Sequence, residues 1–316
     1  MSENKSFLRN VIGEYMAELG ERYNDVVVVN ADLAGTCRNK SFVEKYPERS
    51  FNTGIAEQNM VSFGAGLACE GFYPYVFSMA PFLTMRACEQ CRTDVAYGNR
   101  DVKMIGVYAG LSGGISGATH WAIEDCGIMT SVPNVTVFEV SDVIQTKKIL
   151  DYSATHHGPI YIRSSVEPTL NIYDEGIEIK KGGSLEVKTG NDGVFLCAGV
   201  VVQYALEAAN NYIIKDKTGK DIRVVDMYSI KPVDEEAVIC AADTGRIVVA
   251  QDHNVYGGLG TMVAKVIAEN NLNTKFVNVG VKDEFVAMAH ANYLYHYFGM
   301  DAEGLEKTML SLLRED

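Results

Sequence analysis

Apolar residues follow two spacings along the chain, and the alternation of those spacings predicts the fold. Val26–Asn30 is a short, almost continuously apolar run, which is typical of a strand buried on both faces. Just before it, apolar residues recur every three or four positions and predict an amphipathic helix over residues 5–21. The two patterns then alternate: further strands are predicted at Tyr73–Ser78, Val102–Tyr108, Val135–Val140 and Ile160–Arg163, and further helices from Ala56, Phe82, Ile123 and Val143.

A second alternating set follows an irregular stretch at residues 164–191, whose turns and charges predict a connector with one or two edge strands. Its strands are predicted at Val194–Ala198, Ile222–Met227, Ile247–Gln251 and Phe276–Val279, and its helices at 200–212, 235–242, 260–269 and 301–314. Such alternation predicts an α/β protein with two doubly wound, mostly parallel sheet domains. We place the first domain at residues 1–170, the connector at 171–190 and the second domain at 191–316.

Composition narrows the classes of partner. The chain has 316 residues, enough for about two domains, and its net charge of −13 leaves no basic stripe for nucleic acid. No apolar run approaches the roughly 20 residues that span a bilayer, and Met1–Lys5 lacks the basic-then-apolar order of a signal peptide. Seven cysteines, an odd number, lie in segments predicted to be core, as expected of reduced thiols in a cytoplasmic protein.

The helix predicted from Ala56 carries one carboxylate, Glu57, in its first turn. Acidic residues at a helix N-terminus commonly do no more than interact favourably with the helix dipole. A glutamate in a dry cleft would instead have a raised pKa and could hold or exchange one proton with a ligand. The residue alone leaves both interpretations open.

The sequence around this glutamate, Gly54–Met60 (GIAEQNM), resembles the motif that carries the catalytic glutamate of transketolase-type thiamine diphosphate enzymes. The resemblance continues through Thr119-His120 and Arg163 into the last third of the chain. It covers nearly the whole chain, but it corresponds only to the C-terminal half of a full-length transketolase. It implies a pyrimidine-binding domain with the thiamine-diphosphate fold, followed by a transketolase C-terminal-like domain.

By this resemblance, three residues would serve the cofactor. Glu57 would hydrogen-bond N1′ of the aminopyrimidine, so that the exocyclic nitrogen of that ring can take the proton from C2 of the thiazolium. Phe82 would stack on the aminopyrimidine, although a phenylalanine at a helix start is equally typical of a core position. Asp32 would lie near the cofactor and the subunit contact, although it could equally be a turn or capping residue.

Residues 108–120 form a loop with four glycines in 13 positions, which is typical of positive φ angles or of close approach between backbone and ligand. A P-loop is excluded because no Gly-Lys-Ser/Thr follows. The family has a similar loop that ends in Thr-His, and its histidine contacts sugar hydroxyls. The resemblance therefore implies that His120 is a hydrogen-bonding or proton-shuttling catalytic residue.

The same loop departs from the family pattern at three places. Ile115-Ser116 stands where an acidic residue and a hydroxyl-reading aspartate are usual. Tyr108 replaces a second histidine, and Trp121 replaces a common glutamine. These changes indicate retained chemistry in an altered substrate pocket, with Ser116 and Tyr108 as substrate-binding residues.

Two further residues imply an anionic end on the substrate. Arg163 matches the arginine that binds substrate phosphate in the family, and a guanidinium fork suits bidentate recognition of such groups. Thr36 matches a serine that assists the same phosphate. A phosphate or a sulfonate on the substrate is therefore expected.

Other signals are weaker. Cys88 and Cys91 form a Cys-x-x-Cys, but no second pair or nearby histidine completes a tetrahedral zinc site, and their helical spacing indicates core packing. His253 precedes a predicted helix in a glycine-rich turn and gives only a weak indication of a ligand site. No metal ligand is predicted in this chain.

The sequence contains no Gly-Asp-Gly, the motif with which thiamine diphosphate enzymes anchor the diphosphate and its metal. The resemblance therefore implies a split transketolase, in which a separate N-terminal subunit holds the diphosphate with Mg²⁺ or Ca²⁺, in an α2β2 heterotetramer. Met79, Phe82 and Met85 are candidates for the apolar contact surface. The reaction would move a two-carbon ketol unit from a ketose to an aldose, with sugar phosphates or similar anionic sugars as substrates.

Two alternatives remain open. The β subunits of 2-oxoacid dehydrogenases have a similar length and also lack Gly-Asp-Gly, but Glu57-Gln58-Asn59 with Thr119-His120 resembles transketolase and deoxyxylulose phosphate synthase more closely. A non-catalytic relative would keep the fold for assembly or regulation. Loss of the acidic pair in the glycine-rich loop favours that alternative, whereas the retention of Glu57, Phe82 and His120 argues against it.

Overall fold

The first half of the chain forms a sheet whose central strands are the predicted apolar runs. The structure is a computed structural model that describes residues 5–211, 214 and 218–314. The order across its seven strands is β12 (Ser229–Lys231), β6 (Thr136–Glu139), β7 (Ile160–Ser164), β5 (Lys103–Val107), β4 (Tyr73–Met79), β2 (Val26–Asn30) and β3 (Ser50–Asn52). All neighbours are parallel except β12 and β6. Such strands are apolar along their length because helices cover both faces.

The helices of this half divide between the two faces of the sheet. One face packs against α1 (Leu8–Arg22), α2 (Lys40–Lys45) and α6 (Val143–Thr155). The other packs against α3 (Glu57–Cys69), α5 (Asp125–Ser131) and the helical turns on either side of α4 (Cys88–Gln90). Successive residues of β2 supply both layers, since Val28 belongs to the first core and Val29 to the second.

Two of the predicted helices differ in the structure. The predicted helix over residues 5–21 begins only at Leu8, because Lys5–Ser6 forms a short strand, β1, that pairs with β8 (Thr169–Leu170). The continuous helix predicted from Phe82 to about Tyr97 is instead two π-helical turns, Phe82–Arg86 and Cys91–Ala96, on either side of α4. Turns of this kind occur often at functional sites.

The second half forms a sheet of five strands, confirming the predicted α/β fold with two mostly parallel sheets. Its order is β14 (Lys275–Val281), β13 (Arg246–Asn254), β10 (Val194–Cys197), β11 (Arg223–Asp226) and β9 (Leu185–Lys188), and only β9 is antiparallel to its neighbour. One face carries α7 (Val201–Asn210), α11 (Ala291–Tyr297) and α12 (Ala302–Arg314). The other carries α9 (Glu235–Ala242) and α10 (Leu259–Glu269), which share a core with the first half.

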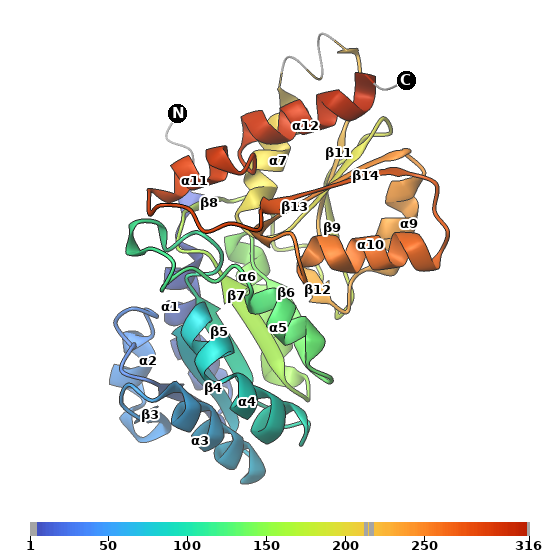
Figure 1. Cartoon of the computed structure of the whole chain (residues 1–316). Helices are drawn as coiled ribbons and strands as arrows, with labels where there is room; N and C mark the ends of the chain where they lie inside the picture. The colour runs from blue at the N-terminus through green and yellow to red at the C-terminus, as the bar shows by residue number, and fades with distance from the viewer. Residues whose placement is uncertain (1–4, 212–213, 215–217, 315–316) are drawn as a thin grey trace.

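The two halves interlock, which the sequence pattern did not predict. β12 lies in the second half of the sequence but completes the sheet of the first half. Conversely, Leu111, Trp121 and Ile123 belong to the first half but pack in the core beneath α7, α11 and α12. In Figure 1 the green loop that follows β5 accordingly lies next to the red helix α11. The limits proposed for the two domains, 1–170 and 191–316, stay a prediction.

Among the described residues, no helix combines the length and the apolar character needed to cross a membrane. All seven cysteines are free thiols.

Candidate functional site

Glu57 lies where the helix predicted from the GIAEQNM motif begins. It is the first residue of α3, and its side chain is only 5% exposed. A cavity of about 560 Å³ opens beside it, lined by Ile55, Ala56, Glu57, Gln58, Asn59 and Arg86. A buried carboxylate at a helix N-terminus is favoured by the helix dipole, and here it also faces a space that a ligand can enter.

Arg86 is a member of this site that the sequence reasoning missed. Its Nη1 donates to Glu57 Oε1 at 3.0 Å, and its guanidinium lies 4.0 Å from the centre of the Phe82 ring. The Phe82 ring in turn meets the His120 ring edge-on, with 5.4 Å between their centroids. We call Glu57, Arg86, Phe82 and His120 the Glu57 cluster. The spacing of Phe82 and Arg86, four positions apart in a predicted helix, was the signal that could have found Arg86.

The glycine-rich loop holds His120 through its own backbone. Gly110 and Ala122 form an antiparallel bridge at the base of the loop, and the His120 amide donates to Gly117 O at 2.9 Å. The hydroxyl of Thr119 lies 2.9 Å from Nδ1 of His120. Gly117 has a φ of 76°, which is why glycine is favoured where the loop turns back.

The departures within this loop separate into two kinds. Ile115 and Ser116 are exposed at its tip. Trp121 is buried, and its Nε1 donates to Gly114 O at 3.0 Å. The inference that Trp121 alters the substrate pocket is therefore corrected: its indole packs in the core of the second half and supports the loop from behind.

Asp32 and Thr36 lie in the loop that follows β2. Asp32 has a φ of 59°, and its amide donates to Asn52 Oδ1 at 2.9 Å. The same Asn52 oxygen accepts from the Gly54 amide at 3.1 Å, so the Asp32 loop is joined to the start of the GIAEQNM motif. Asp32 also borders a second cavity of about 260 Å³. Thr36 is half-buried in the same loop.

The structure corrects the predicted role of Arg163. Its side chain is fully buried, with Nε 2.8 Å from Asp125 Oδ2 and Nη1 2.8 Å from Glu139 Oε2. Nη2 donates to Asp125 Oδ1 and to the carbonyl oxygens of Ala122 and Asp252. No part of the guanidinium reaches the Glu57 cavity, so it cannot present its fork to a substrate. Arg163 instead joins the two halves of the chain.

Arg9, which the sequence reasoning also missed, contacts the predicted substrate residue Tyr108. Nη1 of Arg9 donates to the Tyr108 hydroxyl at 3.1 Å, and the guanidinium lies 5.3 Å from the centre of that ring. Nε of Arg9 is buried without a hydrogen-bond partner among the described residues. Burial raises the pKa of the Cys37 thiol to about 12, and Arg9 opposes that rise. Arg9 therefore contacts Tyr108 directly and influences Cys37, the residue after Thr36, through its charge.

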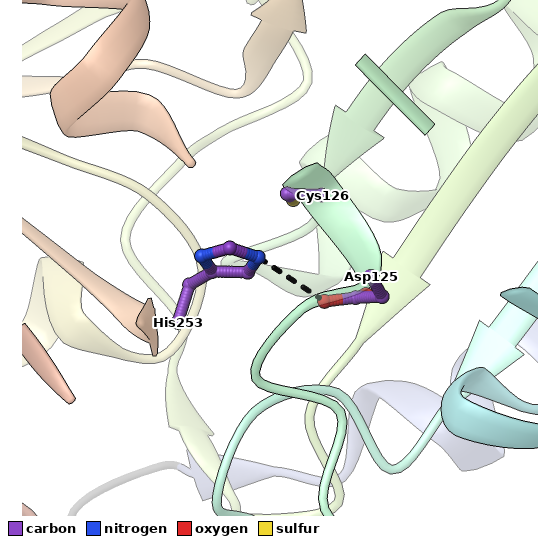
Figure 2. A group of neighbouring side chains, drawn as sticks. All are labelled: Asp125, Cys126 and His253. Atoms are coloured by element: carbon purple, nitrogen blue, oxygen red, sulfur yellow. Dashed lines mark ion pairs between the residues drawn. The ribbon is translucent and has the colours of Figure 1, made fainter. Parts of the chain in front are cut away.

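Asp125, Cys126 and His253 are the one group of the described residues with donors close enough for a metal ion (Figure 2). Each donor is already engaged. Asp125 accepts from Tyr161 and Arg163, and His253 Nε2 accepts from the Gly127 amide while Nδ1 lies 2.9 Å from Asn254 O.

The charges around this group also oppose a metal. Burial raises the pKa of the Cys126 thiol and so disfavours the thiolate that a metal needs, although burial also lowers the pKa of His253 to about 4 and keeps that ring neutral at pH 7. A cation here would have to displace the Arg163 guanidinium from Asp125. This group is a packed joint between β13 and α5, and the weak indication of a ligand site at His253 is not supported.

Comparison with known proteins gives the same family for both halves. The pyrimidine-binding domain of transketolase matches residues 5–168, and the transketolase C-terminal domain matches residues 182–305. A putative transketolase C-terminal section from Methanocaldococcus jannaschii is 37% identical over 98% of this chain and 97% of its own length. One subunit of an apulose-4-phosphate transketolase from Phocaeicola vulgatus is 32% identical over 100% of both chains. A 6-deoxy-6-sulfo-D-fructose transketolase subunit from a Clostridium species is 34% identical over 94% of this chain and 91% of its own.

Solved structures similar to this chain are also transketolases. A split-gene transketolase, described as an inactive beta4 tetramer, superposes with a TM-score of 0.86 at 33% identity and covers 97% of this chain and 98% of its own. The transketolase of Leishmania mexicana superposes with a TM-score of 0.81 at 21% identity over 100% of this chain and 46% of its own, which shows a shared fold.

Proposed function

Because the chain belongs to the transketolase family, with a pyrimidine-binding domain followed by a C-terminal domain, we propose that it is one subunit of a two-chain, thiamine-diphosphate-dependent transketolase. The observation that carries the proposal is Glu57, a buried carboxylate beside an open cavity and joined through Arg86 to an aromatic ring. Relatives that are themselves a section or a subunit of a transketolase support the two-chain form.

The residues present suit one part of the cofactor. Glu57 and Phe82 offer the carboxylate and the ring face that an aminopyrimidine needs, whereas the chain has no Gly-Asp-Gly to hold a diphosphate and its metal. A partner subunit would therefore hold the diphosphate with Mg²⁺ or Ca²⁺. When bound, thiamine diphosphate supplies the carbanion chemistry. Glu57 would hold a proton at N1′ of the ring, and the half-exposed Arg86 would leave its place beside that carboxylate.

The rest of the site suits an anionic sugar. His120 would hydrogen-bond the sugar hydroxyls near the reacting carbons and would accept or donate a proton at those hydroxyls. Arg9, with Tyr108 and Thr36, would bind the anionic end of the substrate, since its buried Nε has no protein partner among the described residues. Relatives named for a sugar phosphate and for a sulfo-sugar support a substrate of this class. The reaction proposed is transfer of a two-carbon ketol unit from a ketose to an aldose.

The surface around the Glu57 cluster suits a partner chain. Ile55 and Ile115 are 79% and 63% exposed, and Met85 is 43% exposed, whereas Met79 and Phe82 are half-buried. Apolar side chains in such a position are typical of a contact surface. We propose that an N-terminal transketolase subunit covers them in an α2β2 assembly. The free thiols suit an assembly that works in the reducing cytoplasm.

Titration calorimetry with thiamine diphosphate and Mg²⁺ tests the proposal. This chain alone should not bind the cofactor, and a mixture with a chain that carries the Gly-Asp-Gly half should bind it tightly and transfer ketol units. Tight binding by this chain alone, or no binding by the mixture, would overturn it.

A further inference from the structure

The glycine-rich loop is attached at its base to the second half of the chain through one carboxylate. Asp252 on β13 accepts the Leu111 amide on Oδ1 at 2.8 Å. Its other oxygen, Oδ2, accepts the hydroxyl of Tyr295 on α11, also at 2.8 Å. All these atoms are buried, and the Asp252 side chain is 1% exposed. A buried carboxylate with both oxygens bonded is a rigid joint, because loss of either bond would leave a buried polar group unpaired.

The loop approaches this carboxylate so closely that only glycine fits. Gly110 has a φ of 63°, and a Cβ added to it would lie 2.1 Å from Cγ of Asp252. Both the backbone angle and the space therefore require glycine at this position. The close approach places the carboxylate directly against the bare backbone of the loop.

The other end of the loop is joined to the same strand. Nη2 of Arg163 donates to the carbonyl oxygens of Ala122 and Asp252, and the Asn254 amide donates to Ile123 O at 2.9 Å. Figure 2 shows the neighbouring contact, in which His253 from β13 faces Asp125 at the start of α5. Both ends of the loop are thus fixed by β13, while His120 extends to the Phe82 ring.

We propose that Asp252 is a positioning residue for His120, through which the C-terminal domain becomes a working part of the active site. The inference rests on the function proposed above. By accepting from Leu111 and Tyr295 at once, Asp252 fixes the base of the loop and thereby the distance between His120 and Phe82. An asparagine can accept only the Leu111 bond on its oxygen, and its amide nitrogen would have to donate to the Tyr295 hydroxyl, so the second hydrogen bond could persist only in reverse.

The ionisation of Asp252 gives a second way to test its hold on the loop, through the effect of pH. Burial raises the pKa of Asp252 to about 7, while the Leu111 amide, Arg163 on β7 and Tyr295 on α11 lower it and Glu139 on β6 raises it further. A protonated carboxyl group would donate to the Tyr295 hydroxyl instead of accepting from it. The packing of the loop should therefore change as the pH passes through about 7.

Trp121 makes the loop observable in this chain alone. It is the only tryptophan, and it lies buried directly after the last residue of the loop. In Asp252→Asn, the emission of Trp121 should shift to longer wavelength, its quenching by acrylamide should increase, and its change with pH near 7 should disappear. Asp226→Asn is the matched control, because Asp226 is equally buried on β11 but bonds to Ser141, Gln145 and Tyr173 away from the loop.

The assembled enzyme provides the second test. Asp252→Asn should lower kcat by about 10- to 100-fold, because small misplacements of a reacting group have effects of that size. The same substitution should have much less effect in a His120→Ala background, since contacts that act through one residue are not additive. Asp226→Asn should leave kcat near the wild-type value.

Unchanged Trp121 emission and unchanged kcat in Asp252→Asn would overturn the proposal, as would an equal loss of kcat with and without His120. If Asp252→Asn does not fold, Tyr295→Phe removes only one hydroxyl and should produce the same changes at smaller size. An assembly that lacks ketol transfer even as wild type would reject the proposed function, and Trp121 emission would still decide whether Asp252 holds the loop.

Discussion

Two arginine–carboxylate pairs in this chain differ in their exposure to solvent. Arg86 and Glu57 meet at 3.0 Å beside a cavity, and 51% of the Arg86 side chain is exposed. Arg163 and Asp125 meet at 2.8 Å, and neither side chain is exposed at all. The same ion-pair chemistry is therefore open to a ligand in the first pair and closed to it in the second.

The difference lies in what covers each pair. The carboxyl end of β7 is covered by β13, whose Asp252 carbonyl takes one of the Arg163 hydrogen bonds. The start of α3 has no such cover among the described residues, and Ile55 beside it is largely exposed. Breaking a buried ion pair leaves a buried charge without its partner and destabilises the fold strongly. An exposed pair contributes little to stability. Stability should therefore depend on Arg163, and activity on Glu57.

The largest expected effect comes from the closed pair. Arg163→Met leaves Asp125 and Glu139 buried without their cation, and it should lower the free energy of unfolding by about 3–5 kcal/mol. Urea denaturation of this chain measures the loss. Arg86→Met is the matched variant of the open pair and should lower the same free energy by less than Arg163→Met does, because half of the Arg86 side chain is exposed. A stable Arg163→Met with a raised KM would restore Arg163 as a substrate ligand.

The open pair should show its importance in turnover. Glu57→Gln keeps the shape of the side chain but removes its charge, and kcat of the assembled enzyme should fall about 100-fold or more. Unfolding of the variant chain should resemble that of the wild type. Glu89→Gln, which changes an exposed carboxylate on α4, serves as the control and should leave kcat unaltered. Near-normal turnover in Glu57→Gln would remove this residue from the mechanism.

Arg9 sharpens the comparison as a cation whose Nε has no hydrogen-bond partner among the described residues. Arg9→Met should raise KM for sugars that end in phosphate or sulfonate by about 10- to 100-fold, since that is the range of a hydrogen bond to a charged group. A neutral sugar should be affected little. Steady-state kinetics on both kinds of substrate measure the difference, with Arg22→Met on the same helix as the control. Equal KM values for Arg9→Met and wild type would reject Arg9 as the anion ligand.

Per pH unit, the smallest expected effect is a slope in stability set by Asp226, a second buried carboxylate between the halves. Burial raises the pKa of Asp226 to about 7, above the value of about 3.9 in an unfolded chain. Between these values the folded chain keeps a proton that the unfolded chain has lost. The free energy of unfolding should therefore decrease as the pH rises from about 4 to about 7, by at most about 1.4 kcal/mol per pH unit from this group.

Urea denaturation over that pH range measures the slope, and Asp226→Asn should remove this contribution to it. The Glu89→Gln variant should keep the wild-type slope, because its carboxylate is exposed. A slope that is the same in Asp226→Asn and wild type would show that Asp226 titrates normally.

Local patterns were enough to predict the elements and the class of fold. Val26–Asn30 is apolar at nearly every position because a central parallel strand is buried on both faces, and it forms β2 with the predicted bounds. Helical spacing also placed the start of α3 at the GIAEQNM motif, so the position of Glu57 in a first helical turn was predicted and found. Its chemical role stays a prediction.

Other features had no local signal. An extra residue per turn in Phe82–Arg86 does not alter the apolar spacing enough to reveal a π-helical turn. β12 is only three residues long, and its pairing with β6 depends on the packing of the two halves. Arg86 lies in the same segment as Phe82, but its partner Glu57 is 29 positions away.

By itself, then, the sequence determined which segments are strands and helices, that they alternate, and which motif begins α3, because these depend on residues a few positions apart. Only the tertiary structure decided that the Arg163 ion pair is buried and that Arg86 is half exposed. It also decided that Arg9 contacts Tyr108 and that Asp252 bonds to the base of the glycine-rich loop. An arginine has the same local pattern whether it faces a ligand or a buried carboxylate. What distinguishes the two is the element packed over it, and for Arg163 that element is β13, 89 positions further along the chain.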